Sequence, residues 1–122
     1  MKANRVIVCS LNDAVHSLPS LSSKAGYKLE KSDFALVKPN VCGLYHPSLD
    51  ILSGIVKFLL PNVGSIVIGE TRSMIHDPEE QFESLGIYAL QKRFRGHVRA
   101  VDLSDDQWIR LRVPSPHVLE EI

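Results

Sequence analysis

The sequence has no excess of charge of either sign. Its 122 residues include 14 Lys and Arg and 14 Asp and Glu, so the formal net charge is zero. Domains that bind nucleic acids normally carry a basic excess, so the balance argues against a nucleic-acid partner. It also removes electrostatic repulsion between copies of the chain, and we therefore expect a homo-oligomer.

Cysteine is scarce and long apolar runs are missing. Cys9 and Cys42 are the only two cysteines, and they form no C-x-x-C pattern, so the chain has no disulfide framework. Two buried, reduced thiols are the simplest interpretation. The apolar run at 6–9 is too short for the core of a signal peptide. No run reaches the roughly 18 apolar residues that a membrane-spanning helix needs. We expect a cytoplasmic protein with no membrane partner.

Several sequence fingerprints are also absent. No G-x-G-x-x-G motif follows the first apolar run, and no G-x-x-x-x-G-K-[S/T] motif occurs, so nothing marks a dinucleotide or P-loop phosphate site. There is no G-x-S-x-G nucleophile elbow either. The motifs therefore name no catalytic residue and no cofactor.

What the sequence does contain is a series of short apolar runs typical of buried strands. They lie at 6–9, 34–37, 66–68 and 98–103, and an alternating stretch at 108–113 is typical of an edge strand. Helical patterns lie between the runs. The best covers 48–60, and another begins at Asp77-Pro78, where a cap residue precedes proline. A weaker helical region after Asn12 should be interrupted by Pro19.

Apolar strands that alternate with helices predict a parallel sheet covered by helices. The fold predicted for residues 1–122 is therefore a single α/β domain. We expect a three-layer αβα sandwich, Rossmann-like, with a mostly parallel sheet of four to five strands.

Polar residues follow two of the predicted strands, at the end where open parallel sheets bind ligands. Lys38 comes directly after the run 34–37. It could bind a small anion, pair with Glu70, act as a base if desolvated, or be a surface lysine beside the Pro39 turn. Asn40 either contributes to a site or closes that turn with its side chain.

The second loop begins with Glu70 and Thr71. Glu70 could be a metal ligand or a base, or it could form a salt bridge with Lys38 or Arg72. The candidate ligand-binding residues are Lys38, Asn40, Glu70 and Thr71.

Two further groups of residues deserve a hypothesis. Four side chains could in principle converge on a metal, although their spacing matches no standard ligand pattern: Cys42, His46, Glu70 and His76. The basic group at 92–95 contains an aromatic residue. On a neutral domain it is interpreted as a helix C-terminal charge cluster rather than a nucleic-acid patch.

An ordered set of short motifs resembles domain-of-unknown-function family 362. Phe34 to Asn40 resembles the family's V-x-[IV]-K-P-N signature, and His46-Pro47 stands where the family has His-Pro before a helix. A buried strand ending in Gly69-Glu70 comes next, then an F-x-x-x-G segment at 82–86. The last match is a strand that ends in Asp102, and the resemblance extends over about residues 30–122.

The resemblance implies a bacterial or archaeal protein whose chain is the front part of a larger family domain. Some family members carry a ferredoxin-like iron–sulfur module, which needs four cysteines, so two cysteines put a redox role in doubt. Family members also continue into a further strand and a Lys-x-His stretch. The expected function is a ligand- or metal-binding front half with a small cleft at the strand ends. The alternative is a non-catalytic scaffold or protein-interaction domain that uses the same residues structurally.

Overall fold

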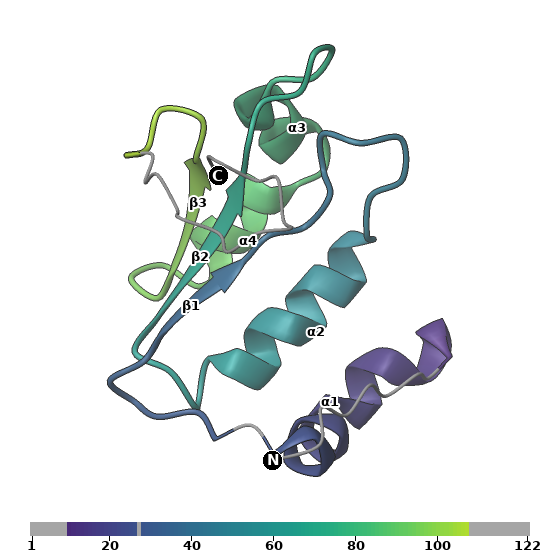
Figure 1. The fold of residues 1–122 in the computed structure, drawn as a ribbon, viewed down its shortest axis with the longest axis vertical. Coiled ribbons are helices and arrows are strands. Elements are labelled where there is room, and N and C mark those ends of the chain that lie inside the picture. The colour runs from purple at the N-terminus through teal and green to yellow at the C-terminus, as the bar shows by residue number, and fades with distance from the viewer. Residues whose placement is uncertain (1–9, 27, 108–122) are drawn as a thin grey trace, which may run out of the picture.

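The computed structural model describes residues 10–26 and 28–107. Within them, β1 (Phe34–Val37), β2 (Ser65–Glu70) and β3 (Val98–Asp102) form a parallel sheet in the order β1-β2-β3 (Figure 1). The predicted α/β class and parallel sheet are confirmed. The predicted strands at 6–9 and 108–113 lie outside the described residues, so a sheet of four to five strands stays a prediction.

The described residues contain four helices: α1 (Leu11–Ala25), α2 (Leu49–Leu59), α3 (Pro78–Ser84) and α4 (Ile87–Arg93). Two of their start signals act as the sequence predicts. The Ser48 hydroxyl accepts a hydrogen bond from Ile51 N–H, and the Asp77 carboxylate accepts one from Glu79 N–H at 2.9 Å. These bonds satisfy N–H groups that the first helical turn leaves without a partner.

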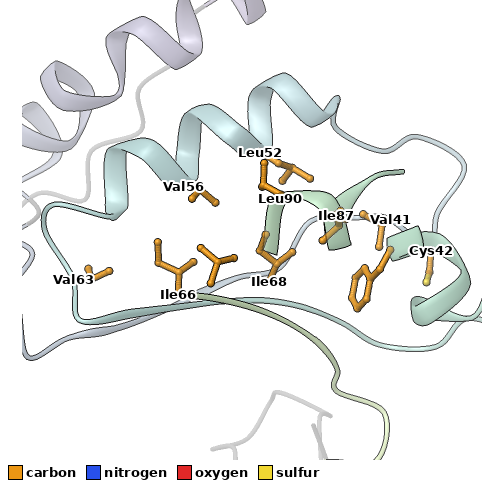
Figure 2. Close-up of a cluster of buried hydrophobic side chains, with 11 residues drawn as sticks. Val41, Cys42, Leu52, Val56, Val63, Ile66, Ile68, Ile87 and Leu90 are labelled. Carbon is orange, nitrogen blue, oxygen red and sulfur yellow. The ribbon is translucent and has the colours of Figure 1, made fainter. Parts of the chain in front are cut away.

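The hydrophobic core lies between one face of the sheet and the helices. Ile66 and Ile68 of β2 point toward Leu52 and Val56 of α2, and α4 adds side chains to the same layer (Figure 2). These side chains are almost fully buried, and Leu52 and Val56 are spaced four residues apart, as expected for one face of a helix. Since α2 connects β1 to β2, its packing on the sheet positions the end of β1 and the start of β2 relative to each other.

The other face of the sheet is more open. Successive strand residues point to opposite faces, and Phe34 and Leu36 alternate with the less exposed Ala35 and Val37. Phe34 is 61% exposed and Leu36 is 51% exposed. Within the described part of the chain the helices pack on the opposite face, so the three-layer sandwich stays a prediction.

The first helix differs from the prediction. α1 runs without a break through Pro19, which was expected to interrupt it. A proline in a helix removes one hydrogen bond, and here the remaining helix is fixed at both ends. Ser10 caps its start, and Gly26 ends it in the left-handed conformation at φ 79°. α1 packs on α2 at Gly54, where a Cβ atom would collide with Val15.

Candidate functional site

The two predicted strand-end loops leave the sheet at the same end, one after β1 and the other after β2, so their first residues lie side by side (Figure 1). β1 and β2 are parallel neighbours, with Val37 beside Ile68, so the residues that follow them lie close together. The Lys38 ammonium donates a hydrogen bond to Glu70 Oε1. The Glu70 side chain is 4% exposed, whereas the Lys38 side chain is 52% exposed. Of the alternatives open for Lys38, pairing with Glu70 is the one observed.

Both oxygens of the Glu70 carboxylate are engaged. Oε1 also accepts the Thr71 N–H at 2.8 Å, and Oε2 accepts the Val41 N–H at 3.1 Å. Burial raises the pKa of the Glu70 carboxyl, but the hydrogen bonds from Lys38, Thr71 and Val41 outweigh it, so the net pKa lies below the ordinary value. Glu70 is therefore an ionised acceptor that holds two main-chain segments and one side chain.

Asn40 and Thr71 contribute to this end of the sheet mainly through structure. The Asn40 amide donates to the Tyr45 carbonyl at 3.1 Å and so closes the first loop. Its side chain also lies against Gly43, where a Cβ atom would collide with it. Thr71 acts through its main-chain N–H on Glu70, and its hydroxyl lies 3.5 Å from the same carboxylate oxygen. The four candidate ligand-binding residues thus lie close together, and all four are held by hydrogen bonds within the chain.

A second ionic link fixes the loop after β2. The Arg72 guanidinium donates to Asp77 at 3.2 Å and to Asp102 at 2.9 Å. Burial raises the pKa of the Asp102 carboxyl. Hydrogen bonds from Ser104 and Arg72 lower the pKa by more than burial raises it, so the net pKa is below the ordinary value. The suggested Glu70–Arg72 pair is not among the observed salt bridges, because Arg72 points to the end of β3 instead.

The side chains considered as metal ligands have separate roles. Cys42 is buried, and burial raises the pKa of its thiol, with a smaller opposing effect from the main chain of Ser73. His46 is exposed beside the Pro47 carbonyl, and His76 lies 3.4 Å from the Gln81 amide. Across residues 10–26 and 28–107, no three His, Cys, Asp or Glu side chains form a group that could hold a metal ion.

The loop ends carry a feature that the sequence interpretation missed. Leu44 and Tyr45 are 84% and 86% exposed, and on the other loop Met74 is fully exposed and Ile75 is 78% exposed. We call these four residues the loop-end surface. The signal was present as two pairs of large apolar residues, Leu44-Tyr45 and Met74-Ile75, in the loops that follow the two strands. Since exposed apolar residues are common singly, four on two adjoining loops are the informative observation.

Comparison of the chain with models of known protein families, with curated proteins and with solved structures finds no match. The resemblance to family 362 therefore stays a prediction. Among the described helices, none combines the length and apolar character needed to cross a membrane.

Proposed function

We propose that the chain is a non-catalytic protein-interaction domain whose contact surface is the loop-end surface. The observation that carries this proposal is the arrangement at the strand ends. The Lys38–Glu70 pair fixes the roots of two loops, while the tips of the same loops expose four large apolar side chains. Exposed apolar side chains on loops whose positions are fixed are typical of a surface that binds another protein.

The state of Glu70 supports an interaction role over catalysis. A general base needs a free lone pair and a pKa near the working pH. Glu70 has a lowered pKa and gives its oxygens to Lys38, Val41 and Thr71. The carboxylate therefore stabilises the loops and is poorly suited to removing a proton from a substrate.

The partner that we propose is a second copy of the chain. Every copy has zero formal net charge, so two copies do not repel each other at long range. Each copy also presents the same loop-end surface, as a two-fold symmetric dimer requires. Burial of Tyr45 and Met74 would supply the kind of aromatic and methionine contacts that are enriched at interfaces.

Sedimentation equilibrium tests this proposal. We expect the wild-type mass to rise with concentration above the 13.6 kDa of one chain. The double variant Leu44→Ser/Met74→Ser should weaken association by about tenfold or more, if these side chains are among the minority near an interface centre whose truncation costs over about 1 kcal/mol. The variant Leu36→Ser, on the open face of the sheet, is the matched control and should associate like the wild type. A wild-type chain that stays monomeric, or a control that dissociates equally, would contradict the proposal.

A second candidate function is favoured by the exposure of Lys38. Its side chain is half exposed although the ammonium pairs with Glu70, so it can still reach a small anionic ligand from solvent. Asn40, Glu70 and Thr71 would then line the cleft, as expected for the front half of a family-362 protein. Titration with sodium acetate and with sodium phosphate, followed by amide NMR, tests this candidate. Saturable shifts confined to residues 38–41 and 70–72 would support it, and unchanged spectra would reject it.

The finer fold belongs to the same proposal. We infer a Rossmann-like sheet of four to five strands, of which three are described. The support is that β1 and β3 each have one neighbour among the described strands. The outer edge of β3 is partly occupied, because Ala100 N–H donates to the Gln91 side chain at 2.6 Å. The β1 edge is therefore the better place for an added strand.

A further inference from the structure

A basic hollow lies at the end of the sheet opposite to the loop-end surface. It has a volume of about 530 Å³ and is lined by residues from the end of α4, the following turn and the start of β3. These segments lie at the end of the strands away from the loops that follow β1 and β2 (Figure 1). Its lining includes Lys92, Arg95 and Arg99, together with Tyr88 and Gln91, and among the described residues it contains no carboxylate. This volume is in the range of small-molecule sites.

The cations that border this hollow differ from the cations at the strand ends. Lys38 and Arg72 form salt bridges with carboxylates. Within the described ranges, no salt bridge involves Lys92, Arg95 or Arg99. Since the chain as a whole is neutral, three cations without an acidic partner in the described part of the chain concentrate positive charge locally.

The helix dipole does not account for the whole group. Basic residues in the last turn of a helix are favoured by the dipole, which explains Lys92 and its neighbour Arg93. Arg95 lies beyond the last residue of α4, and Arg99 belongs to a strand. The helix dipole therefore does not explain why all three cations border one hollow, whereas binding of an anion there would explain it.

Neutral groups in the lining suit the same kind of ligand. Gln91 uses its side-chain oxygen to accept the Ala100 N–H, which fixes the side chain and leaves its amide nitrogen as a donor. Tyr88 is held edge-on to Phe82, with ring centroids 5.8 Å apart. Its ring and hydroxyl thus have a defined position beside the cations.

We propose that this hollow binds a small phosphate-bearing anion with more than one negative charge. Lys92, Arg95 and Arg99 provide the charge, and Gln91 provides a neutral donor. Guanidinium and ammonium groups form strong, charge-assisted hydrogen bonds to phosphate oxygens. The proposal is independent of the loop-end surface, which lies at the other end of the strands.

Sodium pyrophosphate is the test ligand, titrated into the full chain at fixed ionic strength and followed by amide NMR. We expect saturable shifts within residues 88–99 of the wild type. The double variant Lys92→Gln/Arg95→Gln should weaken binding roughly tenfold or more, because two charge-assisted contacts are removed. Arg99→Gln should weaken pyrophosphate binding severalfold. No such effect is expected if the basic residues serve only to complement the dipole of α4.

The double variant Lys31→Gln/Lys57→Gln is the control, since it removes the same charge from two exposed lysines elsewhere. It should bind pyrophosphate within about twofold of the wild type if the effect is local rather than due to screened long-range charge. Shifts that never saturate, or equal weakening by the control pair, would overturn the proposal. So would binding of a single-stranded oligonucleotide without any saturable binding of pyrophosphate. Unchanged thermal unfolding of each variant establishes that it is folded.

Discussion

Replacing Lys38 with methionine is expected to lower the free energy of unfolding by about 2–3 kcal/mol at pH 7. The substitution leaves the Glu70 carboxylate buried without its cation, although the N–H groups of Val41 and Thr71 remain. Breaking a fully buried pair costs about 3–5 kcal/mol, and the half-exposed Lys38 justifies a smaller figure. Urea unfolding followed by circular dichroism measures the difference. Lys57→Met on α2 is the control and should change stability by less than about 0.5 kcal/mol.

The pH dependence separates charge from packing. The pKa of Glu70 is lowered in the folded protein, so its stabilising effect is present above the unfolded-state pKa and is lost as the pH falls through the folded-state pKa. In Lys38→Met the Glu70 carboxyl stays buried, which raises its pKa, but it lacks the Lys38 hydrogen bond, which is the largest of the effects that lower it. The stability gap between wild type and variant should therefore narrow below about pH 4.5, the ordinary value for glutamate. A gap that stays constant on acidification would mean that Lys38 acts through packing of its alkyl chain.

Much of the fold could be predicted because local signals and burial agree. Ser48 and Asp77-Pro78 mark helix starts that the structure confirms, and the apolar runs at 34–37, 66–68 and 98–103 become the three described strands. Pro19 shows where local reasoning fails. Pro19 removes one hydrogen bond from α1 and so destabilises the helix at one point. The caps at both ends and the packing on α2 stabilise the helix as a whole, and α1 therefore continues through Pro19.

The candidate site was predicted in location but not in geometry. That loops follow parallel strands at one edge is a property of the fold, so Lys38 and Glu70 could be placed together from the sequence. Which of two cations would pair with Glu70 could not be predicted. Arg72 follows Glu70 by two residues, and Lys38 follows the neighbouring strand, so the sequence places both cations near this carboxylate. The choice depends on side-chain direction, which sends Arg72 toward Asp77 and Asp102.

The F-x-x-x-G segment that contributes to the family resemblance has a physical explanation in this chain. Phe82 is fully buried, and Gly86 adopts a left-handed conformation at φ 77° just before α4. A side chain at that φ is strained, so glycine is favoured there. The segment is thus explained by packing and backbone geometry, as Lys38 and Asn40 are by hydrogen bonds within the chain.

Replacing Phe82 with alanine is expected to lower the free energy of unfolding by about 3–5 kcal/mol, the usual cost of emptying a buried phenylalanine site. α3 has only seven residues and is too short to be stable alone, so it depends on this packing. The edge-on contact with Tyr88 is lost at the same time. Urea unfolding measures the loss, and Phe58→Ala on the half-buried side of α2 is the control, with an expected cost below that of Phe82→Ala.

The reactivity of the Cys42 thiol measures the local effect of Phe82→Ala on the packing around α3. Cys42 is 7% exposed and belongs to the same buried cluster as Phe82. In a Cys9→Ser background, loosening of α3 should release the loop that contains Ser73, and the Cys42 thiol should react faster with a disulfide reagent at a pH where the protein is still folded. Phe58→Ala should leave the Cys42 rate close to that of the background chain. If Phe82→Ala lowers global stability but Cys42 stays equally protected, then α3 does not hold the strand-end loops. The loop-end surface would in that case depend on the Lys38–Glu70 and Arg72 links alone.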